Sequence, residues 1–433
     1  RSVLMKNKDA VLKTKQFCMA PWTHMHFMPN KDVNPCCLSP IDETIGNMEE
    51  QTIKEIWNSE DMRQLRNDML EGKDCANYCG RCYEKEEDGF SSLRTHMNDN
   101  YADTHWDKVE STKEDGTVDD LNLVHWDFRF SNICNQSCRS CGIEFSSQWH
   151  GDFIKLWDIP KDQQPAKIKK IWRDVDAFED DFEELFDKVE YIHFAGGEPL
   201  ITDEHYKVLE KLIERGRTDI TIRYSTNFNQ LKYKKYDVVE MWKHFKHIQL
   251  IASLDDYGDR YNYIRNGGEW NNVIENYKKL KEAGLFDNGN IWFGIHPTIS
   301  FWNIYYLPDF HEECIRLGLI DMNARNNDHH FTQYFHLNPL TFPSYYSPQI
   351  LPKEHKEKVT KKLLEYAEYL TATYNVNSAP LVSLVDLMNA HDNTAELPLM
   401  REWTTKLDKL RNQNSKETFP FLAEIFDNDI PTA

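Results

Sequence analysis

The stretch SNICNQSCRSCG, residues 131–142, holds three cysteines in a C-x3-C-x2-C array: Cys134, Cys138 and Cys141. It follows a run of aromatic and β-branched residues, 124–130, that predicts a strand. Three thiolates on one tight loop can hold three irons of a cubane cluster and leave the fourth iron open to another ligand. A structural zinc site normally takes four protein ligands, and no fourth donor is obvious before His150. The array therefore predicts an iron–sulfur cluster, with zinc as the alternative.

A glycine-rich motif, Gly196-Gly197-Glu198-Pro199, follows the next predicted strand, residues 190–195. Two glycines let the backbone approach a ligand closely, and a carboxylate at a strand end can receive an ammonium group. Alone, such a tetrapeptide is most often a turn. Its position after a strand that follows the cysteine array makes the two motifs together far more specific than either one.

Short strand patterns alternate with amphipathic helical patterns beyond the cysteine array. The predicted strands cover residues 124–130, 190–195, 220–225, 248–254, 291–299 and 331–337. Between them, apolar residues recur at helical spacing, as at Val208, Leu209, Leu212 and Ile213. This alternation predicts an α/β fold with βα units and a parallel sheet, and six units fit a partial TIM-like (β/α)6 barrel. The tail from about residue 345 is predicted to be helical.

Composition narrows the class of protein. The chain has 433 residues, with 51 Lys and Arg against 71 Asp and Glu, and a formal net charge of −20. This balance disfavours a nucleic-acid partner, because phosphate binding needs a cationic surface. Neither a membrane span nor a secretory signal is visible, so we expect a cytoplasmic protein. The charged segment 107–120 is typical of a linker and predicts three parts: an N-terminal cysteine module (1–110), the barrel (121–345) and a helical extension (346–433).

Nine of the ten cysteines lie in the first 141 residues. In a reducing cytosol, closely spaced cysteines are more often metal ligands than disulfides. Six of them precede the predicted linker: Cys18, Cys36, Cys37, Cys75, Cys79 and Cys82. Cys75–Cys82 repeats the spacing of the later array, but it follows a helical pattern and no strand with a glycine-rich end comes after it. Cys314 stands alone in a helical pattern, which predicts a small buried hydrophobic residue.

The cysteine array after the first strand and the Gly-Gly-Glu-Pro motif after the second resemble the radical S-adenosylmethionine (SAM) superfamily. The resemblance covers about residues 121–338. It implies that Cys134, Cys138 and Cys141 hold a [4Fe–4S] cluster to which SAM binds. It also implies SAM contacts at Gly196, Gly197, Glu198, Ser225, Asn227, Ser253, Asp255 and Arg265. Ser140 is a departure, since the family usually has an aromatic residue just before the third cysteine.

The N-terminal cysteines resemble the SPASM and twitch modules that hold auxiliary [4Fe–4S] clusters in the same superfamily. The match covers about residues 17–86, and it implies that Cys18, Cys36, Cys79 and Cys82 bind one auxiliary cluster. Cys37 and Cys75 are left over, so a second auxiliary cluster is an alternative, and a four-thiolate zinc site is another. Here the module precedes the barrel, whereas it usually follows it.

The resemblance implies an enzyme that reductively cleaves SAM to a 5′-deoxyadenosyl radical, which removes a hydrogen from the substrate. A reductant protein such as flavodoxin or ferredoxin would supply the electron. The aromatic residues Phe342, Tyr345 and Tyr346 could line an extended groove and favour a peptide or protein substrate. Dehydrogenation of a small carbohydrate alcohol is the alternative reaction. A zinc-stabilised interaction protein is the non-enzymatic alternative, and the sequence assigns no catalytic residue.

Overall fold

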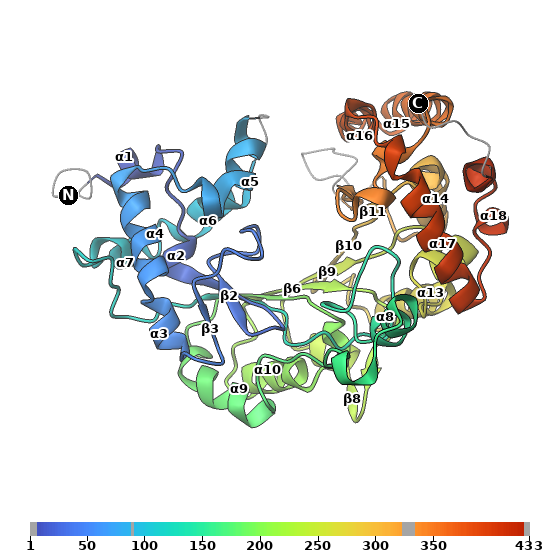
Figure 1. Cartoon of the computed structure of the whole chain (residues 1–433). Helices are drawn as coiled ribbons and strands as arrows, with labels where there is room; N and C mark the ends of the chain where they lie inside the picture. Colours follow the sequence, from blue (N-terminus) through green and yellow to red (C-terminus); the bar gives the residue numbers. More distant parts are fainter. Residues whose placement is uncertain (1–6, 88–90, 323–333, 428–433) are drawn as a thin grey trace. The chain divides into compact units, whose positions relative to one another are not determined.

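The computed structural model describes residues 7–87, 91–322 and 334–427 (Figure 1). Its main sheet has eight strands in the order β10-β9-β6-β5-β4-β1-β2-β3. The chain folds into two compact units. Unit 1 comprises Arg1–Asn132, Ile168–Arg223 and His244–His247, and unit 2 comprises Ile133–Lys167, Tyr224–Lys243 and Ile248–Ala433. Strands β6 (Thr221–Thr226) and β9 (His247–Ala252) begin in unit 1 and continue in unit 2. The predicted α/β class with a mostly parallel sheet is confirmed.

Unit 1 is built on three parallel neighbouring strands: β1 (His24–Phe27), β4 (His125–Phe128) and β5 (Tyr191–Phe194). Two short antiparallel strands, β2 (Asp32–Asn34) and β3 (Gly46–Asn47), extend the sheet beyond β1. Strands β1, β2 and β3 were not predicted. The N-terminal segment therefore does not fold apart from the barrel, because it adds a strand directly beside the barrel's first strand.

Alternate residues of β1, β4 and β5 point to opposite faces of the sheet. One face is aromatic and packs against helix α9 (Val175–Phe182), where Phe178 and Phe182 contact Phe128. Trp126 on the same face contacts Phe182 with ring centroids 4.9 Å apart. Fully burying one such side chain contributes about 1.5–3 kcal/mol, so this face supplies much of the core of unit 1. The opposite face carries histidines and an aspartate.

The segment predicted as a linker is a folded part of unit 1. It contains α7 (Trp106–Glu110) and then a turn that lies on α4 (Glu60–Glu71). Arg63 Nη1 lies 3.2 Å from Asp115 Oδ2, and a Cβ added to Gly116 would lie only 2.2 Å from the Arg63 carbonyl oxygen. The segment is polar because its outer side faces solvent, which is why its sequence looked like a linker.

The remaining helices of unit 1 are mostly short. They are α1 (Lys8–Leu12), α2 (Ala20–Thr23), α3 (Ile53–Trp57), α5 (Ala76–Glu87), α6 (Leu93–Tyr101) and α10 (Asp203–Glu214). The blue part of Figure 1 shows those of the N-terminal segment. Thr52 and Glu55 form a capping box at the start of α3, and Gly72 (φ +69°) ends α4. These local signals fix the helix ends around the N-terminal cysteines.

Unit 2 contains the parallel pair β9 and β10 (Ile291–Ile295), and Ser253 N donates to Thr226 O just after β9. It also holds two small sheets, β7 (Lys232–Tyr233) with β8 (Tyr236–Asp237), and β11 (Thr298–Ile299) with β12 (Asn338–Pro339). The predicted strand 291–299 is thus split into β10 and β11. The predicted strand 331–337 lies partly outside the described residues, and in its described part Phe335 forms a single bridge to Ile295.

The C-terminal extension is helical, as predicted. It comprises α15 (Lys353–Tyr374), α16 (Ala379–Ala390), α17 (Leu397–Arg411) and α18 (Ser415–Thr418), in the red part of Figure 1. The other helices of unit 2 are α8 (Trp149–Trp157), α11 (Val238–Trp242), α12 (Gly258–Ile264), α13 (Trp270–Glu282) and α14 (Leu307–Arg316). Cys314 on α14 is fully buried, as expected. Across residues 7–87, 91–322 and 334–427, no helix has the length and apolar character needed to span a membrane.

Candidate active site and cysteine pocket

The loop after β4 carries Cys134, Cys138 and Cys141, and its backbone is fixed by the turn that follows α12. Ser137 N donates to Asn266 O and Arg139 N donates to Ile264 O, both at 2.8 Å. Gly267 lies at φ +90°, and a Cβ there would come within 2.8 Å of the Asn135 carbonyl oxygen. A side chain at this position would therefore push the cysteine loop away, so a glycine is required.

Two polar side chains approach the sulfur atoms of this loop. Arg265 Nη1 lies 3.8 Å from Cys138 Sγ, and Asn227 Nδ2 lies 4.0 Å from Cys134 Sγ. Burial raises the pKa of Cys138, and burial together with the neighbouring Cys138 thiol raises the pKa of Cys141 to about 12. Buried thiols of this kind become thiolates when they coordinate a metal centre. The loop thus gathers three thiols beside one guanidinium group.

Three of the predicted SAM contacts in unit 2 lie beside the cysteine loop. Arg265 forms a buried ion pair with Asp255, with Nη2 3.0 Å from Oδ1, and Asp255 also accepts from Thr298 N at 2.7 Å. Asn227 donates to Asn135 Oδ1 at 2.7 Å. The other two, Ser225 and Ser253, lie at the end of β6 and just after β9. The loops after β6, β9 and α12 thus place Asn227, Asp255 and Arg265 beside the cysteine loop.

The Gly-Gly-Glu-Pro motif belongs to unit 1 and is anchored to the end of β4. Gly196 has a φ of +99°, and a Cβ on it would lie 2.9 Å from Arg129 Cα, so only glycine fits there. Gly197 N donates to Ser131 O at 3.1 Å. Glu198 is buried, and its Oε1 accepts from Leu200 N at 3.1 Å, which caps the short turn of helix at Pro199–Ile201.

Several residues that hold the cysteine loop were not predicted from the sequence. Trp149 Nε1 donates to Cys138 O at 2.8 Å. The Arg139 side chain is fully buried, with Nη2 2.5 Å from Asp408 Oδ1 on α17 and its guanidinium 3.8 Å from the centre of the Tyr263 ring. Tyr263 Oη also donates to Asp408, at 2.7 Å. Because 269 positions separate Arg139 from Asp408, no local pattern could have paired them.

The N-terminal cysteines form a second group, in unit 1. Cys18, Cys36, Cys79 and Cys82 line one pocket whose apolar walls include Leu65, Met69 and Leu93. Cys79 and Cys82 lie three residues apart on α5 and so share one helix face. Burial raises the pKa values of Cys18, Cys36 and Cys79, and the other thiols of the group add to this.

The two unassigned cysteines lie outside the pocket lining. Cys75 Sγ faces the Lys73 carbonyl oxygen at 3.5 Å, and Cys37 hydrogen-bonds the side chain of Asp127. Among the described residues, no three His, Cys, Asp or Glu side chains converge closely enough for one metal ion. The structure thus gathers in one pocket the four cysteines that the sequence grouped, while Cys37 and Cys75 lie outside its lining, with Cys75 in the same buried cluster as Cys18.

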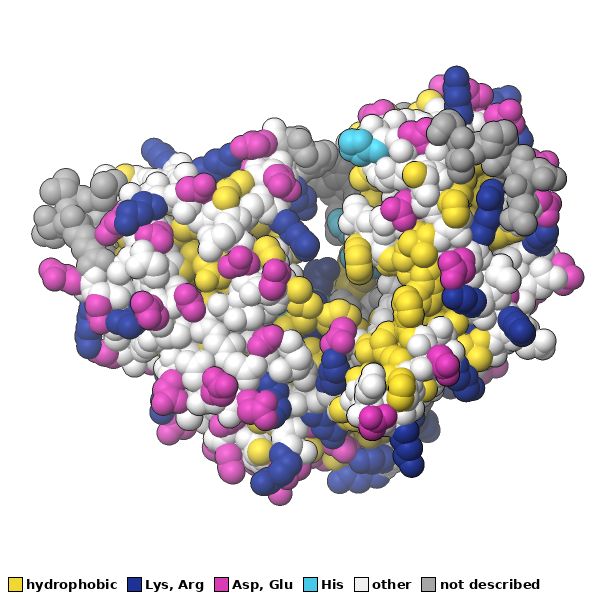
Figure 2. All heavy atoms as spheres, viewed as in Figure 1, with side chains coloured by type: hydrophobic (Ala, Val, Ile, Leu, Met, Phe, Trp, Pro, Cys, Tyr) yellow, Lys and Arg dark blue, Asp and Glu magenta, His cyan; other side chains and the backbone are white. Residues whose placement is uncertain are grey.

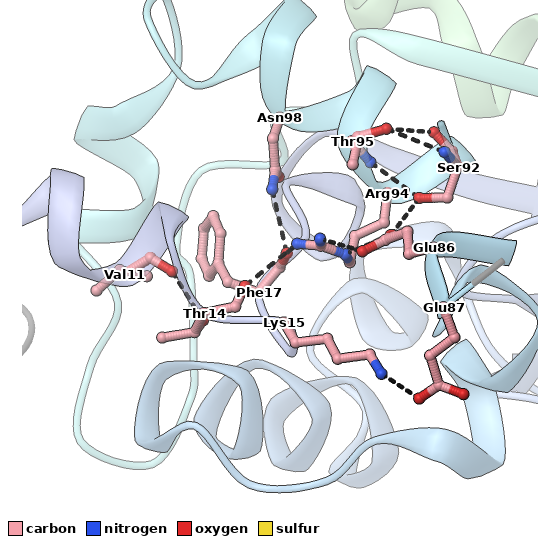
Figure 3. Close-up of polar contacts among 10 residues, drawn as sticks. All are labelled: Val11, Thr14, Lys15, Phe17, Glu86, Glu87, Ser92, Arg94, Thr95 and Asn98. Carbon is pink, nitrogen blue, oxygen red and sulfur yellow. Dashed lines mark hydrogen bonds and ion pairs between the residues drawn. The ribbon is translucent and has the colours of Figure 1, made fainter. Parts of the chain in front are cut away.

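Arg94 and Asn98 on α6 hold the backbone on both sides of Cys18 (Figure 3). Arg94 Nη1 and Asn98 Nδ2 donate to the Phe17 carbonyl oxygen at 2.9 and 3.1 Å. Met19 N donates to Asn98 Oδ1 at 2.9 Å. Arg94 is also paired with Glu86 on α5, with Nη2 2.5 Å from Oε2. These contacts, which the sequence did not reveal, link the Cys18 loop to the helix that carries Cys79 and Cys82.

The comparisons with known proteins agree with both cysteine groups. Residues 128–336 match the family model of the radical SAM superfamily, and residues 18–83 match that of the SPASM iron–sulfur cluster-binding domain. No curated protein matches the chain. One similar solved structure, described as native anSMEcpe with bound AdoMet and Cp18Cys peptide, shares 14% identity over 58% of this chain and 62% of its own, with a TM-score of 0.39.

A second similar structure is Streptococcus suis SuiB bound to S-adenosylmethionine. It shares 15% identity over 73% of this chain and 65% of its own, with a TM-score of 0.35. The chain therefore spans less than two thirds of the length of these solved structures.

Proposed function

We propose that the chain reductively cleaves SAM and removes a hydrogen atom from a substrate, because residues 128–336 match the radical SAM superfamily and residues 18–83, ahead of them, match the SPASM domain. The two domains imply [4Fe–4S] clusters and SAM as cofactors. The observation that carries the proposal is the three-thiol loop, in which Cys134 is buried and Cys138 and Cys141 are half-buried, fixed by polar contacts and faced by Arg265.

The residues of unit 2 fit a cluster that binds SAM. Cys134, Cys138 and Cys141 would ligate three irons, and such a cluster supplies the electron that cleaves SAM. Arg265 near Cys138 would offset the negative charge of the thiolates, while Asp255 keeps its guanidinium in place. Asn227, with Ser225 and Ser253, would meet the polar groups of SAM. In unit 1, Gly196, Gly197 and Glu198 would receive its ammonium group.

The N-terminal pocket fits an auxiliary [4Fe–4S] cluster. Cys18, Cys36, Cys79 and Cys82 would be its ligands, and the apolar lining would exclude water from it. The Arg94 charge favours the thiolate form of Cys18, against the dominant effect of burial. Cys37 and Cys75 are outside the lining, so the geometry supports one auxiliary cluster rather than two.

An exposed aromatic surface on unit 2 supports a peptide or protein substrate. Trp157 and Phe342 are 57% and 85% exposed, and Trp403 lies against Trp157 and Tyr345 with ring centroids 5.3 and 6.0 Å apart. Figure 2 shows apolar side chains gathered where α17 and α8 lie in Figure 1. Exposed aromatic side chains are typical of protein contact sites. Tyr346 is buried against Phe301, so it is not part of this surface.

Dehydrogenation of a carbohydrate alcohol is the second candidate reaction. The observation that favours it is the buried face of histidines and an aspartate on β1, β4 and β5 of unit 1. Such a face offers many hydrogen bonds to a hydroxylated molecule and little to an apolar one.

The test is anaerobic reconstitution with iron and sulfide, followed by SAM and dithionite in place of the flavodoxin or ferredoxin reductant. We expect a brown protein that releases 5′-deoxyadenosine, measured by liquid chromatography. The triple variant Cys134→Ala/Cys138→Ala/Cys141→Ala should release none, whereas Cys314→Ala should match the wild type. A colourless protein that binds only zinc would contradict the proposal and favour a non-enzymatic, zinc-stabilised protein.

A further inference from the structure

Unit 1 presents a histidine face, which we define as His24, His26, His125, Asp127 and His193. These residues alternate along β1, β4 and β5 with the aromatic residues that pack on α9, so they share the opposite face of the sheet. The register places His24 opposite His125, and it aligns His26, Asp127 and His193 in one row across the three strands.

Asp127 is the centre of the polar contacts on this face. Its carboxylate lies 3.1 Å from Arg129 Nη1, 3.3 Å from His26 Nδ1 and 3.4 Å from His193 Nδ1. Burial alone would raise the pKa of Asp127, but the neighbouring His26, His193 and Arg129 hold it well below its usual range. Burial lowers the pKa of His26, and it lowers that of His24 to about 4. Asp127 is therefore held as a carboxylate, while burial favours the neutral forms of His24 and His26.

Such a face is costly for a structural core. Asp127, His26 and His24 are only 1%, 4% and 2% exposed, and burying polar groups costs stability that an apolar face would not. The other face of the same strands shows that these strands can carry an apolar core. In addition, His24 Nε2 is buried and has no hydrogen-bond partner in the structure. Unpaired buried groups and clusters of titratable residues are typical of binding sites.

Within unit 1 the histidine face contacts residues beside both the Gly-Gly-Glu-Pro motif and the N-terminal cysteine pocket, which the proposed reaction uses. At the carboxyl ends of the strands, Arg129 touches both Asp127 and the backbone of Gly196. On the N-terminal side, Cys37 hydrogen-bonds Asp127 while its neighbour Cys36 lines the cysteine pocket. His193 and Arg129 keep 17% and 21% of their side chains exposed, whereas Asp127 and His26 are buried, so His193 and Arg129 are the accessible side chains at this end of the face.

We propose that the histidine face is the substrate-binding surface of the enzyme and that it takes a hydroxyl-bearing group, which hydrogen-bonds the accessible edge of His193 while the buried Asp127 holds His193 and Arg129 in place. This inference rests on the proposed function. An imidazole has two ring nitrogens, and with Nδ1 of His193 facing Asp127, Nε2 is the nitrogen that can meet a hydroxyl group, which both donates and accepts a hydrogen bond. The adjacent Asp127 and Arg129 offset each other's charge, which favours a neutral polar ligand over a charged one.

The hydroxyl group could belong to a carbohydrate or to a serine side chain, and the experiment separates these sources. Saturation-transfer NMR on the full-length protein would use myo-inositol as one probe and the blocked peptide Ac-Ala-Ser-Ala-NH2 as the other, with Ac-Ala-Ala-Ala-NH2 as the hydroxyl-free reference. We expect one hydroxylated probe to bind and the reference not to bind. Asp127→Asn removes the carboxylate that holds His193 and Arg129 in place and should weaken that binding about tenfold or more.

Two further variants keep the test decisive. His193→Gln changes the more exposed neighbour of Asp127 and should also weaken binding, so it serves if Asp127→Asn does not fold. His96→Gln, an exposed histidine on α6, should bind like the wild type. Failure of both hydroxylated probes to bind, or equal binding to the wild type and His193→Gln, would overturn the inference. The assay needs no cluster, so absence of 5′-deoxyadenosine in the reconstituted wild type would instead overturn the proposed function.

Discussion

The two cysteine groups are held in place by different kinds of contact. The loop at residues 134–141 has no regular secondary structure, and polar groups from distant parts of unit 2, such as Asn266 and Asp408, fix it. The N-terminal pocket instead lies in a hydrophobic cluster, with Cys18, Leu65 and Met69 buried in it. The comparison teaches that the loop depends on a few directional interactions, whereas the pocket depends on packing around helices.

Removing either group of cysteines should have the largest effect and should separate their roles. The triple alanine variant of the 134–141 loop should lose about four irons per chain and all SAM cleavage. Cys18→Ala/Cys36→Ala should also lose about four irons but keep SAM cleavage. Iron analysis with 5′-deoxyadenosine quantification checks both. Equal loss of cleavage in the two variants would contradict the separation of roles.

Asp408→Asn should disturb the loop while leaving the N-terminal pocket intact. Arg139 is fully buried, and removing the charge that pairs with it leaves an uncompensated buried cation, which typically costs 3–5 kcal/mol. We expect SAM cleavage to fall strongly while about four irons remain in the N-terminal pocket. Asp408 lies on α17, which carries none of the proposed iron ligands, so any effect on them is indirect. The informative readout is therefore the electron paramagnetic resonance spectrum of the reduced SAM-binding cluster.

Two matched variants test whether Asp408 acts through Arg139. Asp408→Glu keeps the charge and should restore part of the signal and of the cleavage. Asp386→Asn, at an exposed position on α16, should change neither. An unchanged spectrum in Asp408→Asn would show that the C-terminal extension does not position the loop.

Arg94→Ala applies the same kind of change to the N-terminal pocket. It removes the donor to the Phe17 carbonyl and leaves Glu86, which is 15% exposed, without its partner. Loss of such hydrogen bonds to charged groups costs about 1.5–3 kcal/mol, so urea unfolding should shift to lower concentration. We expect the auxiliary iron to be reduced and SAM cleavage to persist. Arg81→Ala, at an exposed position on α5, is the control and should leave both iron content and unfolding unchanged.

The sequence predicted the chemistry of both groups better than it predicted their surroundings. Spacing and strand context distinguish Cys134–Cys141 from the similar Cys75–Cys82 array, and the glycine pair at 196 and 197 predicted a close backbone approach, which the structure has at Gly196. The parallel βα pattern predicted the α/β class because strand and helix periodicities are local properties. The helical tail was equally visible.

What the sequence missed depends on contacts between distant segments. Strand β1 lies in HMHF, residues 24–27, where histidines hide the apolar alternation of a half-buried strand. Its pairing with β4, about one hundred positions away, has no local signal. The same holds for Arg139 with Asp408 and for Asp127 with His26. The polar turn at residues 107–120 was mistaken for a linker because local composition cannot show packing on α4.

Cys37→Ser and Cys75→Ser should have the smallest effects and sharpen the count of clusters. Neither cysteine lines the pocket, although Cys75 is buried in the hydrophobic cluster around it and its Sγ faces the Lys73 carbonyl oxygen at 3.5 Å. We expect each variant to bind as much iron as the wild type, whereas Cys79→Ser, on the same helix as the pocket lining, should lose about four irons. Iron and sulfide analysis after anaerobic reconstitution measures this difference. A loss of iron in Cys37→Ser or Cys75→Ser would mean that a second auxiliary cluster uses cysteines from outside the pocket. The comparison of one packed pocket with one polar loop would then have to include a third cluster site.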